Sequence, residues 1–245
     1  MDAVLVSDLH LDGPGDPTQA AFLRFLGTLP PSVTLVVLGD AFHAWWTFDG
    51  EPFTAYAAVA TALLDFNLVY LPGNHDFHAP AYFGARGATV AGQNGPGATV
   101  RRALGALDAH LSHGDEVDTS VGYRGLHAVL RGRAFHAAMV AAGPGRAWHL
   151  LHHLAGERAL VSRHTVDDDG DDGSPLVLAQ RALAAERAAV LGVHLVAMGH
   201  THVPELSRRG EAQFLNTGDW VAHRSYGIVT GEEVPQGKEG ELLIR

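Results

Sequence analysis

The chain has 245 residues, of which 47% are apolar and 18% are charged, a composition that is typical of a folded globular protein and excludes a disordered one. Its formal charge of −10 argues against a general nucleic-acid-binding protein, because such proteins carry a basic patch, so we expect no stable binding to nucleic acid. The sequence contains no cysteine, which excludes disulfides, a cysteine nucleophile and thiolate-held metals, so any metal must be held by nitrogen and oxygen atoms.

Short apolar runs alternate with longer amphipathic runs from the N-terminus to about residue 116. In chain order they are AVLVSD (3–8), TQAAFLRFLGTL (18–29), TLVVLGD (34–40), AYAAVATALLDF (55–66) and LVYLPGN (68–74), followed by a Gly-rich, strand-like region that ends in LDAHLSHGD (107–115). The short runs predict buried strands and the long ones predict helices, which together indicate an α/β architecture. The first run has no basic leader and is far too short to span a bilayer, so we expect a cytoplasmic protein.

From about residue 117 to 191 the pattern becomes purely helical. The segments 122–143 and 146–163 predict two helices separated by Gly143-Pro144-Gly145, and a further helix is predicted at 176–192, after an acidic loop at 167–172. Strands then return in HLVAMGH, AQFLNTG and YGIVTG. We interpret the chain as one domain, residues 1–245, with a helical cap insertion at about 117–191.

Arginines of the insertion are candidates for substrate binding. Arg124, Arg131 and Arg133 could meet an anionic ligand, with Arg124 and Arg131 the preferred pair. The alternative is that they lie on solvated helix surfaces, as arginines on helices usually do.

Polar residues follow directly on five of the predicted strands. The five segments are Ser7-Asp8-Leu9-His10, Gly39-Asp40, Gly73-Asn74-His75-Asp76, Ser112-His113-Gly114-Asp115 and Gly199-His200-Thr201-His202. Ligands of open α/β sheets collect beyond the carboxyl ends of the strands. Alternation along a strand would also place the first and third residues of a DLH or HTH triplet on one side. A single Asp or His in such a place is commonly a helix cap or a satisfied polar residue, but the coincidence of five segments favours a metal site.

The residue types indicate which metals such a site would hold. Imidazole, carboxylate and amide ligands suit manganese, iron(II), cobalt or zinc. We assign Asp8, His10 and His202 to one ion, Asn74, His113 and His200 to a second ion, and Asp40 as the carboxylate that both ions share. Two ions about 3.5–4 Å apart can clamp a phosphoryl group and activate a water at neutral pH.

The motifs DLH, GD, GNHD, HGD and GHTH, in this order, resemble the calcineurin-like metallophosphoesterase superfamily. The resemblance spans Asp8 to His202 and implies a four-layer α/β/β/α sandwich of two β-sheets flanked by helices, with two metals at the sheet edge. It also implies that the seven residues assigned above are the ligands. By the same resemblance, His75 is catalytic and acts near the leaving group, and Asp76 orients the loop.

A narrower resemblance is to the UDP-2,3-diacylglucosamine pyrophosphatases. The segments that carry it are SDLHL, FLRFL, LGDAFHAWW, GNHDF, HGDEVDTSVGYRGLHAVLR and MGHTHVP. This family implies manganese, a helical insertion that encloses acyl chains, and hydrolysis of a nucleotide-linked lipid to UMP and a lipid sugar phosphate. It also implies peripheral contact with the inner membrane face through the cap. The chain departs from the family at His75, where the family has arginine, and at His43, where an acidic residue often stands.

Two alternatives stay open at the level of the sequence. The first is a phosphodiesterase or phosphatase that acts on nucleotides or other small phosphoesters. The second is a non-catalytic scaffold with the same fold, which should show eroded ligands, whereas this chain retains all seven ligand residues together with His75.

Overall fold

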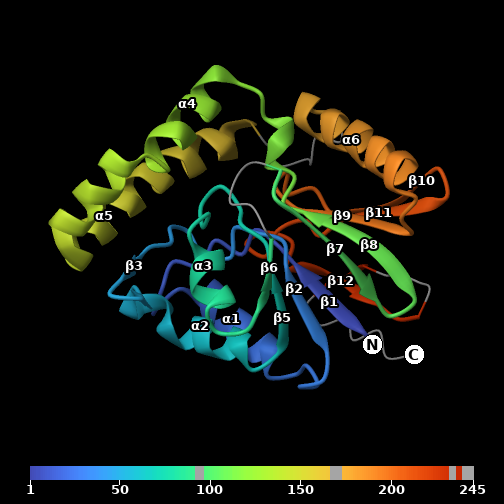
Figure 1. Ribbon diagram of the computed structural model, residues 1–245, viewed down its shortest axis with the longest axis horizontal. Helices are drawn as coiled ribbons and strands as arrows, with labels where there is room; N and C mark the ends of the chain where they lie inside the picture. Colours follow the sequence, from blue (N-terminus) through green and yellow to red (C-terminus); the bar gives the residue numbers. More distant parts are fainter. Residues whose placement is uncertain (92–96, 166–172, 232–235, 239–245) are drawn as a thin grey trace.

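The computed structural model describes residues 1–91, 97–165, 173–231 and 236–238. The acidic loop expected at 167–172 lies outside the described residues. The described strands form two large sheets and one small ribbon, and helices cover the outer faces of both large sheets (Figure 1).

The first large sheet has six strands in the order β13-β12-β1-β2-β5-β6. The strands are β1 (Ala3–Val6), β2 (Thr34–Val37), β5 (Asn67–Tyr70), β6 (Thr89–Val90), β12 (Ser225–Val229) and β13 (Gln236–Lys238). Strands β1, β2, β5 and β6 run parallel, so their carboxyl ends meet at one edge, while β12 pairs antiparallel with β1. The helices between them are α1 (Pro17–Leu26), α2 (Ala57–Leu64) and α3 (Ala79–Gly84), with the turn η1 (Thr54–Tyr56) and the ribbon of β3 (Thr47–Phe48) and β4 (Glu51–Pro52).

The second large sheet has five strands in the order β10-β11-β9-β8-β7. Its strands are β7 (Thr99–Leu104), β8 (Leu107–Ser112), β9 (Leu195–Met198), β10 (Glu205–Arg209) and β11 (Ala212–Asn216), and the turn η2 (Asp115–Val117) follows β8. Here β8, β9 and β11 are parallel. Their carboxyl ends therefore deliver a second group of loops to one edge.

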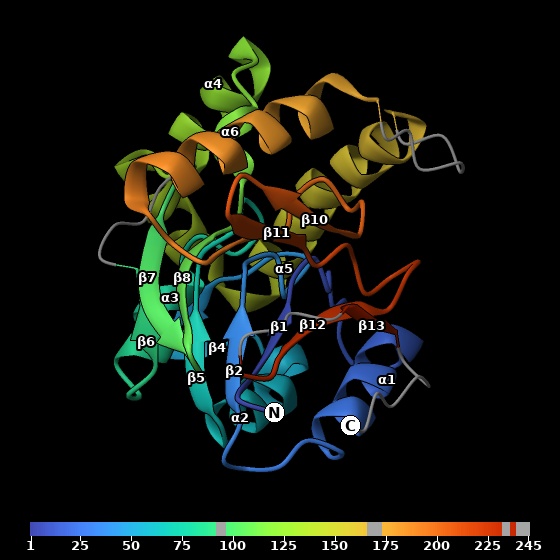
Figure 2. The ribbon, with the colours of Figure 1, turned by 90° about the vertical axis from the view of Figure 1, so that its right-hand side faces the viewer.

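Alternation along the strands builds the layers. In β1, Ala3 and Leu5 belong to the core between the two sheets, whereas Val4 and Val6 face the helices of the first sheet. Helix α6 (Pro175–Leu191) packs Ala184 and Ala188 on the outer face of the second sheet (Figure 2). The α/β/β/α sandwich expected from the resemblance is confirmed.

Helix α6 begins and ends at residues suited to those positions. The Ser174 hydroxyl accepts a hydrogen bond from the Val177 N–H, Pro175 occupies the first turn, and Gly192 ends the helix with φ of 61°. These local signals explain why the predicted bounds, 176–192, agree with the observed ones.

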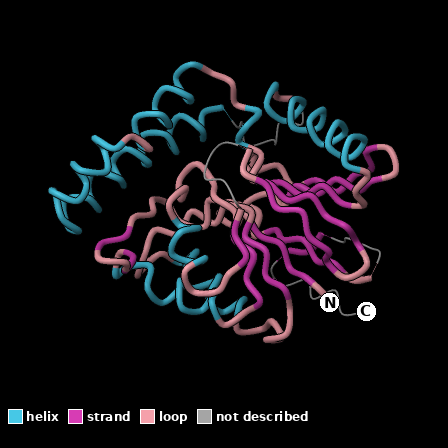
Figure 3. Tube along the Cα trace, in the orientation of Figure 1, coloured by secondary structure: helices cyan, strands magenta, loops and turns pink. Residues whose placement is uncertain are grey.

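Helices α4 (Val121–Leu130) and α5 (Arg133–Thr165) lie over the loops at the strand ends (Figures 1 and 3). The single helix predicted at 122–143 is wrong, because α4 ends at Leu130 and α5 begins at Arg133, with Arg131 and Gly132 outside both helices. Within α5 the chain reverses at Gly143, whose φ of 73° and ψ of 168° are not helical, immediately before Pro144. Among the described residues, none of the helices combines the length and apolar character that a membrane span needs.

Candidate metal centre

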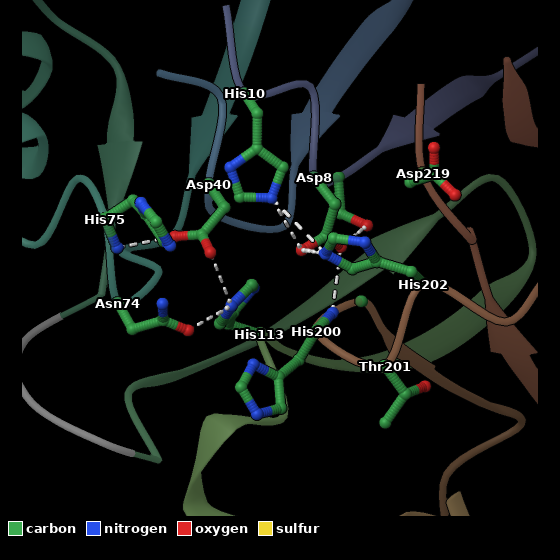
Figure 4. A network of polar contacts seen from close by, with 12 residues as sticks. Asp8, His10, Asp40, Asn74, His75, His113, His200, Thr201, His202 and Asp219 are labelled. Atoms are coloured by element: carbon green, nitrogen blue, oxygen red, sulfur yellow. Dashed lines mark hydrogen bonds and ion pairs between the residues drawn. The ribbon is translucent and has the colours of Figure 1, made fainter. Parts of the chain in front are cut away.

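Loops from five strand ends meet at the edge of the sandwich, beneath α4 and α5. They follow β1, β2 and β5 of the first sheet and β8 and β9 of the second, as the sequence predicts. Figure 4 shows that the side chains of these loops point toward one another.

Asp8, His10 and His202 form one group of potential ligands. The Asp8 Oδ1 atom lies 3.3 Å from the His202 Nε2 atom and 3.9 Å from the His10 Nε2 atom, and the two Nε2 atoms are 3.3 Å apart. The three side chains therefore converge on one point, in the combination expected for one ion.

Asp40, His113 and Asn74 converge on a neighbouring point. The His113 Nε2 atom lies 3.4 Å from the Asp40 Oδ2 atom and 3.3 Å from the Asn74 Oδ1 atom. The other ring nitrogen of His113, Nδ1, lies 2.7 Å from the Leu38 carbonyl oxygen, to which it donates a hydrogen bond. This bond leaves the lone pair of Nε2 directed at the centre. Asp8 and Asp40 also share a ligand group with His113, which places the two points side by side.

The ring of His200 lies beside the second group, and its backbone N–H contacts the first group. Its ring centroid lies 5.1 Å from that of His113, and its N–H donates a 2.8 Å hydrogen bond to Asp8 Oδ2. His200 and His202 therefore direct their rings to different points.

The ligand loops depend on left-handed backbone conformations. Among the described residues, Asp8, His10, Asp40, His200 and His202 are five of the seven non-glycine residues with positive φ, at values from 45° to 71°. Strand alternation, from which the convergence was predicted, is therefore not its cause, because β1 ends at Val6 and β9 at Met198, before these residues. Such conformations cost energy in residues with a Cβ and concentrate at functional sites.

Burial of Asp8 and Asp40 opposes their ionisation, but neighbouring histidines outweigh it. His202 and His113 hold the pKa of the Asp8 carboxyl at about 2. His113 is the main partner that keeps the pKa of Asp40 well below its usual range. Both carboxylates are therefore ionised at neutral pH, as metal ligands must be.

The imidazoles fall into two kinds. Burial, reinforced by nearby histidines, lowers the pKa of His10 to about 3 and that of His200 to about 4. Burial also opposes protonation of His113 and His202, yet the carboxylates beside them raise the pKa of both. Metal binding would displace protons from this second pair.

The surroundings of one buried atom, Asp8 Oδ1, indicate whether a cation fits this site. The Oδ1 atom of Asp8 is buried and, among the described residues, has no hydrogen-bond donor, although the residue is ionised. A buried ionised oxygen that accepts no hydrogen bond is costly unless a cation faces it, either a protonated His202 at 3.3 Å or a bound metal ion. Carboxylate, imidazole and amide atoms are suitable ligands for divalent ions of intermediate softness. The residues present therefore fit a pair of divalent ions.

Gly73 allows Asp40 to reach the centre. A Cβ atom at Gly73 would overlap with Asp40 Oδ1, and one at Gly39 (φ 94°) would meet Gly73 itself. The two loops can therefore approach each other only with glycine at these positions.

Gly73→Ala is expected to displace the Asp40 carboxylate and to lower metal affinity or turnover by about 10- to 100-fold, as other losses of ligand support do. The measurements are bound metal per chain, turnover and the unfolding temperature. Gly145→Ala is the control, because a Cβ there meets nothing within 4 Å. Unchanged metal content and turnover in Gly73→Ala would contradict this role for Gly73.

His75 is held beside Asp40 by two contacts. Its N–H donates a 2.7 Å hydrogen bond to Asp40 Oδ1, and its ring Nδ1 donates to the His43 carbonyl oxygen at 2.8 Å. The second bond leaves Nε2 available to a substrate. Asp76 fixes the loop by accepting hydrogen bonds from the Gly73 N–H at 2.8 Å and the Tyr70 hydroxyl at 2.5 Å.

Sequence reasoning missed a supporting layer behind the ligands. Gln180 on α6 donates a 2.7 Å hydrogen bond to the Gly199 carbonyl oxygen and accepts one of 2.7 Å from Asn216. The N–H of Trp220 donates to the Asp8 carbonyl oxygen at 3.2 Å, and Asp219 lies beside His202 in Figure 4. The polar segment NTGD, which directly follows AQFL in the sequence, is a signal from which this loop could be predicted.

An apolar pocket opens beside His75, between the loops after β2 and β5 and the helices α4 and α5. Its walls include Trp46, Phe77, Leu126, Leu130, Leu151 and Leu154, and its polar end is formed by His43, Asn74 and His75. The metal centre and an apolar surface therefore meet in one cavity.

Arg124 and Arg131 do not join the metal ligands. They line a second pocket, on another face of α4, together with Tyr123 and the two acidic residues Glu116 and Asp118. The ring of Tyr123 lies 6.3 Å from that of His200, so this pocket borders the second group of ligands.

The two-sheet sandwich and the ligand set at its edge define a metal-dependent hydrolase. The chain belongs to the calcineurin-like phosphoesterase family, whose model matches residues 1–204. The family implies divalent metal ions as cofactors.

Two curated relatives carry the same name. A UDP-2,3-diacylglucosamine hydrolase of Xanthomonas campestris pv. campestris (strain B100) is 31% identical over 216 residues, covering 84% of each chain. That of Xanthomonas axonopodis pv. citri (strain 306) is 31% identical over 250 residues, covering 97% of this chain and 93% of the relative. A solved archaeal phosphodiesterase is 12% identical, with a TM-score of 0.48, and the match covers 96% of this chain and 98% of that one.

Proposed function

We propose that this chain hydrolyses the pyrophosphate bond of UDP-2,3-diacylglucosamine or a similar nucleotide-linked lipid. The observation that carries the proposal is the apolar pocket whose polar end is formed by Asn74 and His75, next to the candidate ligands. A substrate that joins a pyrophosphate to acyl chains would match both parts of this cavity. The names of the two Xanthomonas relatives support the same substrate.

Two divalent ions, manganese first among them, complete the proposed site. Asp8, His10 and His202 would hold one ion, Asn74, His113 and His200 the other, and Asp40 would contact both. When bound, such ions lower the pKa of water and offset the charge of a phosphoryl group.

His75 would act on the leaving group. In the reaction, the oxygen of a water bonds to the nucleotide-side phosphorus, and the bond from that phosphorus to the bridging oxygen breaks. The bridging oxygen leaves with the electron pair on the lipid sugar phosphate, and the two protons of the water pass to the two phosphate products. Because Nδ1 donates to the His43 carbonyl oxygen, His75 would need the imidazolium form to donate through Nε2, and in that form Nε2 would pass its proton to the bridging oxygen as the bond breaks.

The cap would hold the rest of the substrate. We propose that the acyl chains lie in the apolar pocket beneath α4 and α5, and that Arg124 and Arg131 bind an anionic part of the substrate from the second pocket. The guanidinium of Arg131 lies 4.9 Å from the ring centroid of Phe77, which lines the apolar pocket. A single domain with this cap would thus bind the substrate on both faces of α4.

A cytoplasmic location, with contact between the cap and the inner membrane face, follows from the same proposal. Large apolar side chains are exposed on α4 and α5: Val121 (88%), Val129 (61%), Val140 (56%) and Leu150 (42%). Exposed apolar groups of this kind can enter a lipid interface. Failure to co-sediment with phospholipid vesicles would count against the contact.

Release of UMP from UDP-2,3-diacylglucosamine tests the proposal. The manganese-loaded protein is expected to release UMP faster than it hydrolyses a generic aryl phosphodiester, and chelation should abolish both reactions until manganese is restored. Hydrolysis of nucleotides or aryl esters without UMP release would favour a general phosphoesterase. Bound metal without any hydrolysis would favour the non-catalytic scaffold.

A further inference from the structure

His43 forms part of the polar end of the apolar pocket, next to His75. The rings of His43 and His75 have centroids 5.8 Å apart, and nitrogen atoms of His10, His43 and His75 all lie within 4.8 Å of one another. Of these three, His10 already faces Asp8 and His202 through its Nε2 atom. His43 and His75 are therefore the two imidazoles that face the cavity beside the centre.

The backbone fixes the position of His43. Its N–H donates a 3.0 Å hydrogen bond to the Leu11 carbonyl oxygen, and its own carbonyl oxygen accepts the 2.8 Å bond from the His75 ring. The N–H of Trp45 donates to the His75 carbonyl oxygen at 3.3 Å. The two loops are thus tied together, and the two imidazoles keep a fixed separation.

The neighbours of His43 have other partners. His152, whose ring lies 5.4 Å away, contacts Asp12 at 2.9 Å and the Tyr56 hydroxyl at 3.2 Å through Nε2, and donates through Nδ1 to the Trp148 carbonyl oxygen at 2.9 Å. Among the residues that the structure describes, none gives the His43 imidazole a hydrogen bond. The ring is only partly buried and borders the pocket, so it is available to a ligand.

We propose that His43 is a second substrate-contacting histidine, which donates a hydrogen bond to the phosphate that leaves with the lipid sugar. Charge-assisted N–H···O bonds measure about 2.7–2.9 Å, so one phosphate can bridge nitrogen atoms of His43 and His75 that lie within 4.8 Å. The lipid sugar would then extend from this phosphate toward the apolar walls of the pocket. His43 would select substrates whose leaving group carries a phosphate, an inference that rests on the proposed function.

Two substrates that share the reacting phosphorus separate this role from general catalysis. UDP-2,3-diacylglucosamine has a phosphate in its leaving group, whereas the p-nitrophenyl ester of UMP leaves an aryloxide. His43→Ala is expected to lower kcat/KM about 10- to 100-fold on the first and to change it less than about twofold on the second. His43→Gln, which keeps a donor, should recover part of the loss. Equal effects on both substrates, or no effect on either, would overturn the inference.

Metal content and phosphate inhibition complete the test. Wild type and His43→Ala are expected to bind the same number of manganese ions, and a lost ion would make His43 a metal ligand instead. The exposed His149 on α5 supplies the control variant, His149→Ala, which should behave as wild type. If wild type hydrolyses the aryl ester but not the lipid, the proposed substrate fails. In that case inorganic phosphate tests His43 instead, as an inhibitor of aryl-ester hydrolysis. Its inhibition constant should be about tenfold higher in His43→Ala than in wild type, and an unchanged inhibition constant would refute the role of His43.

Discussion

Asp40→Ala is expected to lose at least one of the two divalent ions and nearly all turnover. The Asp40 carboxylate is buried between the two ligand groups, where one oxygen faces His113 Nε2 at 3.4 Å and the other accepts the 2.7 Å hydrogen bond from the His75 N–H. A carboxylate has two oxygens and can contact two ions, whereas alanine contacts none. Asp40→Asn should also fail, because an amide offers one acceptor oxygen and no charge.

Bound manganese per chain and kcat measure the effect of Asp40→Ala directly. The rise in unfolding temperature on adding manganese is a second measurement, since a ligand at 100 times its dissociation constant stabilises a folded protein by about 2.7 kcal/mol. This rise should shrink in Asp40→Ala and persist in Asp65→Ala, a change at the exposed end of α2. Two bound ions and unchanged turnover in Asp40→Ala would refute the shared-ligand assignment.

The positions of the candidate ligands could be predicted because each follows a short apolar run. The runs before Asp8, Asp40 and Asn74 are the parallel strands β1, β2 and β5, and those before His113 and His200 are β8 and β9. Such runs are too short for buried helices and too apolar for surface loops. Strand ends that share an edge bring their loops together whatever the loops contain.

The conformations within those loops could not be predicted in the same way. Positive φ at Asp8 or His202 opposes the local preference of a residue with a Cβ, and persists only where surrounding contacts enforce it. Some of these contacts come from distant residues, such as the Trp220 N–H that bonds the Asp8 carbonyl oxygen. A pattern read along the chain contains no information about such partners.

The break between α4 and α5 was missed for a different reason. Apolar residues continue at helical spacing across Arg131 and Gly132, and one glycine costs a helix only about 1 kcal/mol. That cost is small compared with tertiary packing, which here turns the chain so that Met139 of α5 becomes fully buried in the core cluster of the first sheet. Periodicity predicts that helices form, but packing decides where one ends and the next begins.

His75→Ala is expected to retain both metal ions while turnover on the pyrophosphate falls about 10²- to 10⁴-fold, the usual contribution of a group that handles a proton. The ions should remain because His75 holds Asp40 through its backbone N–H, which any substitution except proline preserves. The side chain contributes the Nε2 atom and the bond from Nδ1 to the His43 carbonyl oxygen, and both are lost in alanine.

The leaving group determines how large the loss is. An aryloxide needs little protonation, so His75→Ala should lose less on the p-nitrophenyl ester of UMP than on UDP-2,3-diacylglucosamine. Arginine in His75→Arg is a cation that can pair with a phosphate, and this variant should therefore retain more activity than alanine on the lipid pyrophosphate in particular. The measurements are metal content and kcat/KM for wild type and both variants on both substrates. Loss of metal in His75→Ala would show that this histidine is a metal ligand. Equal losses of kcat/KM on both substrates would show that it does not act on the leaving group.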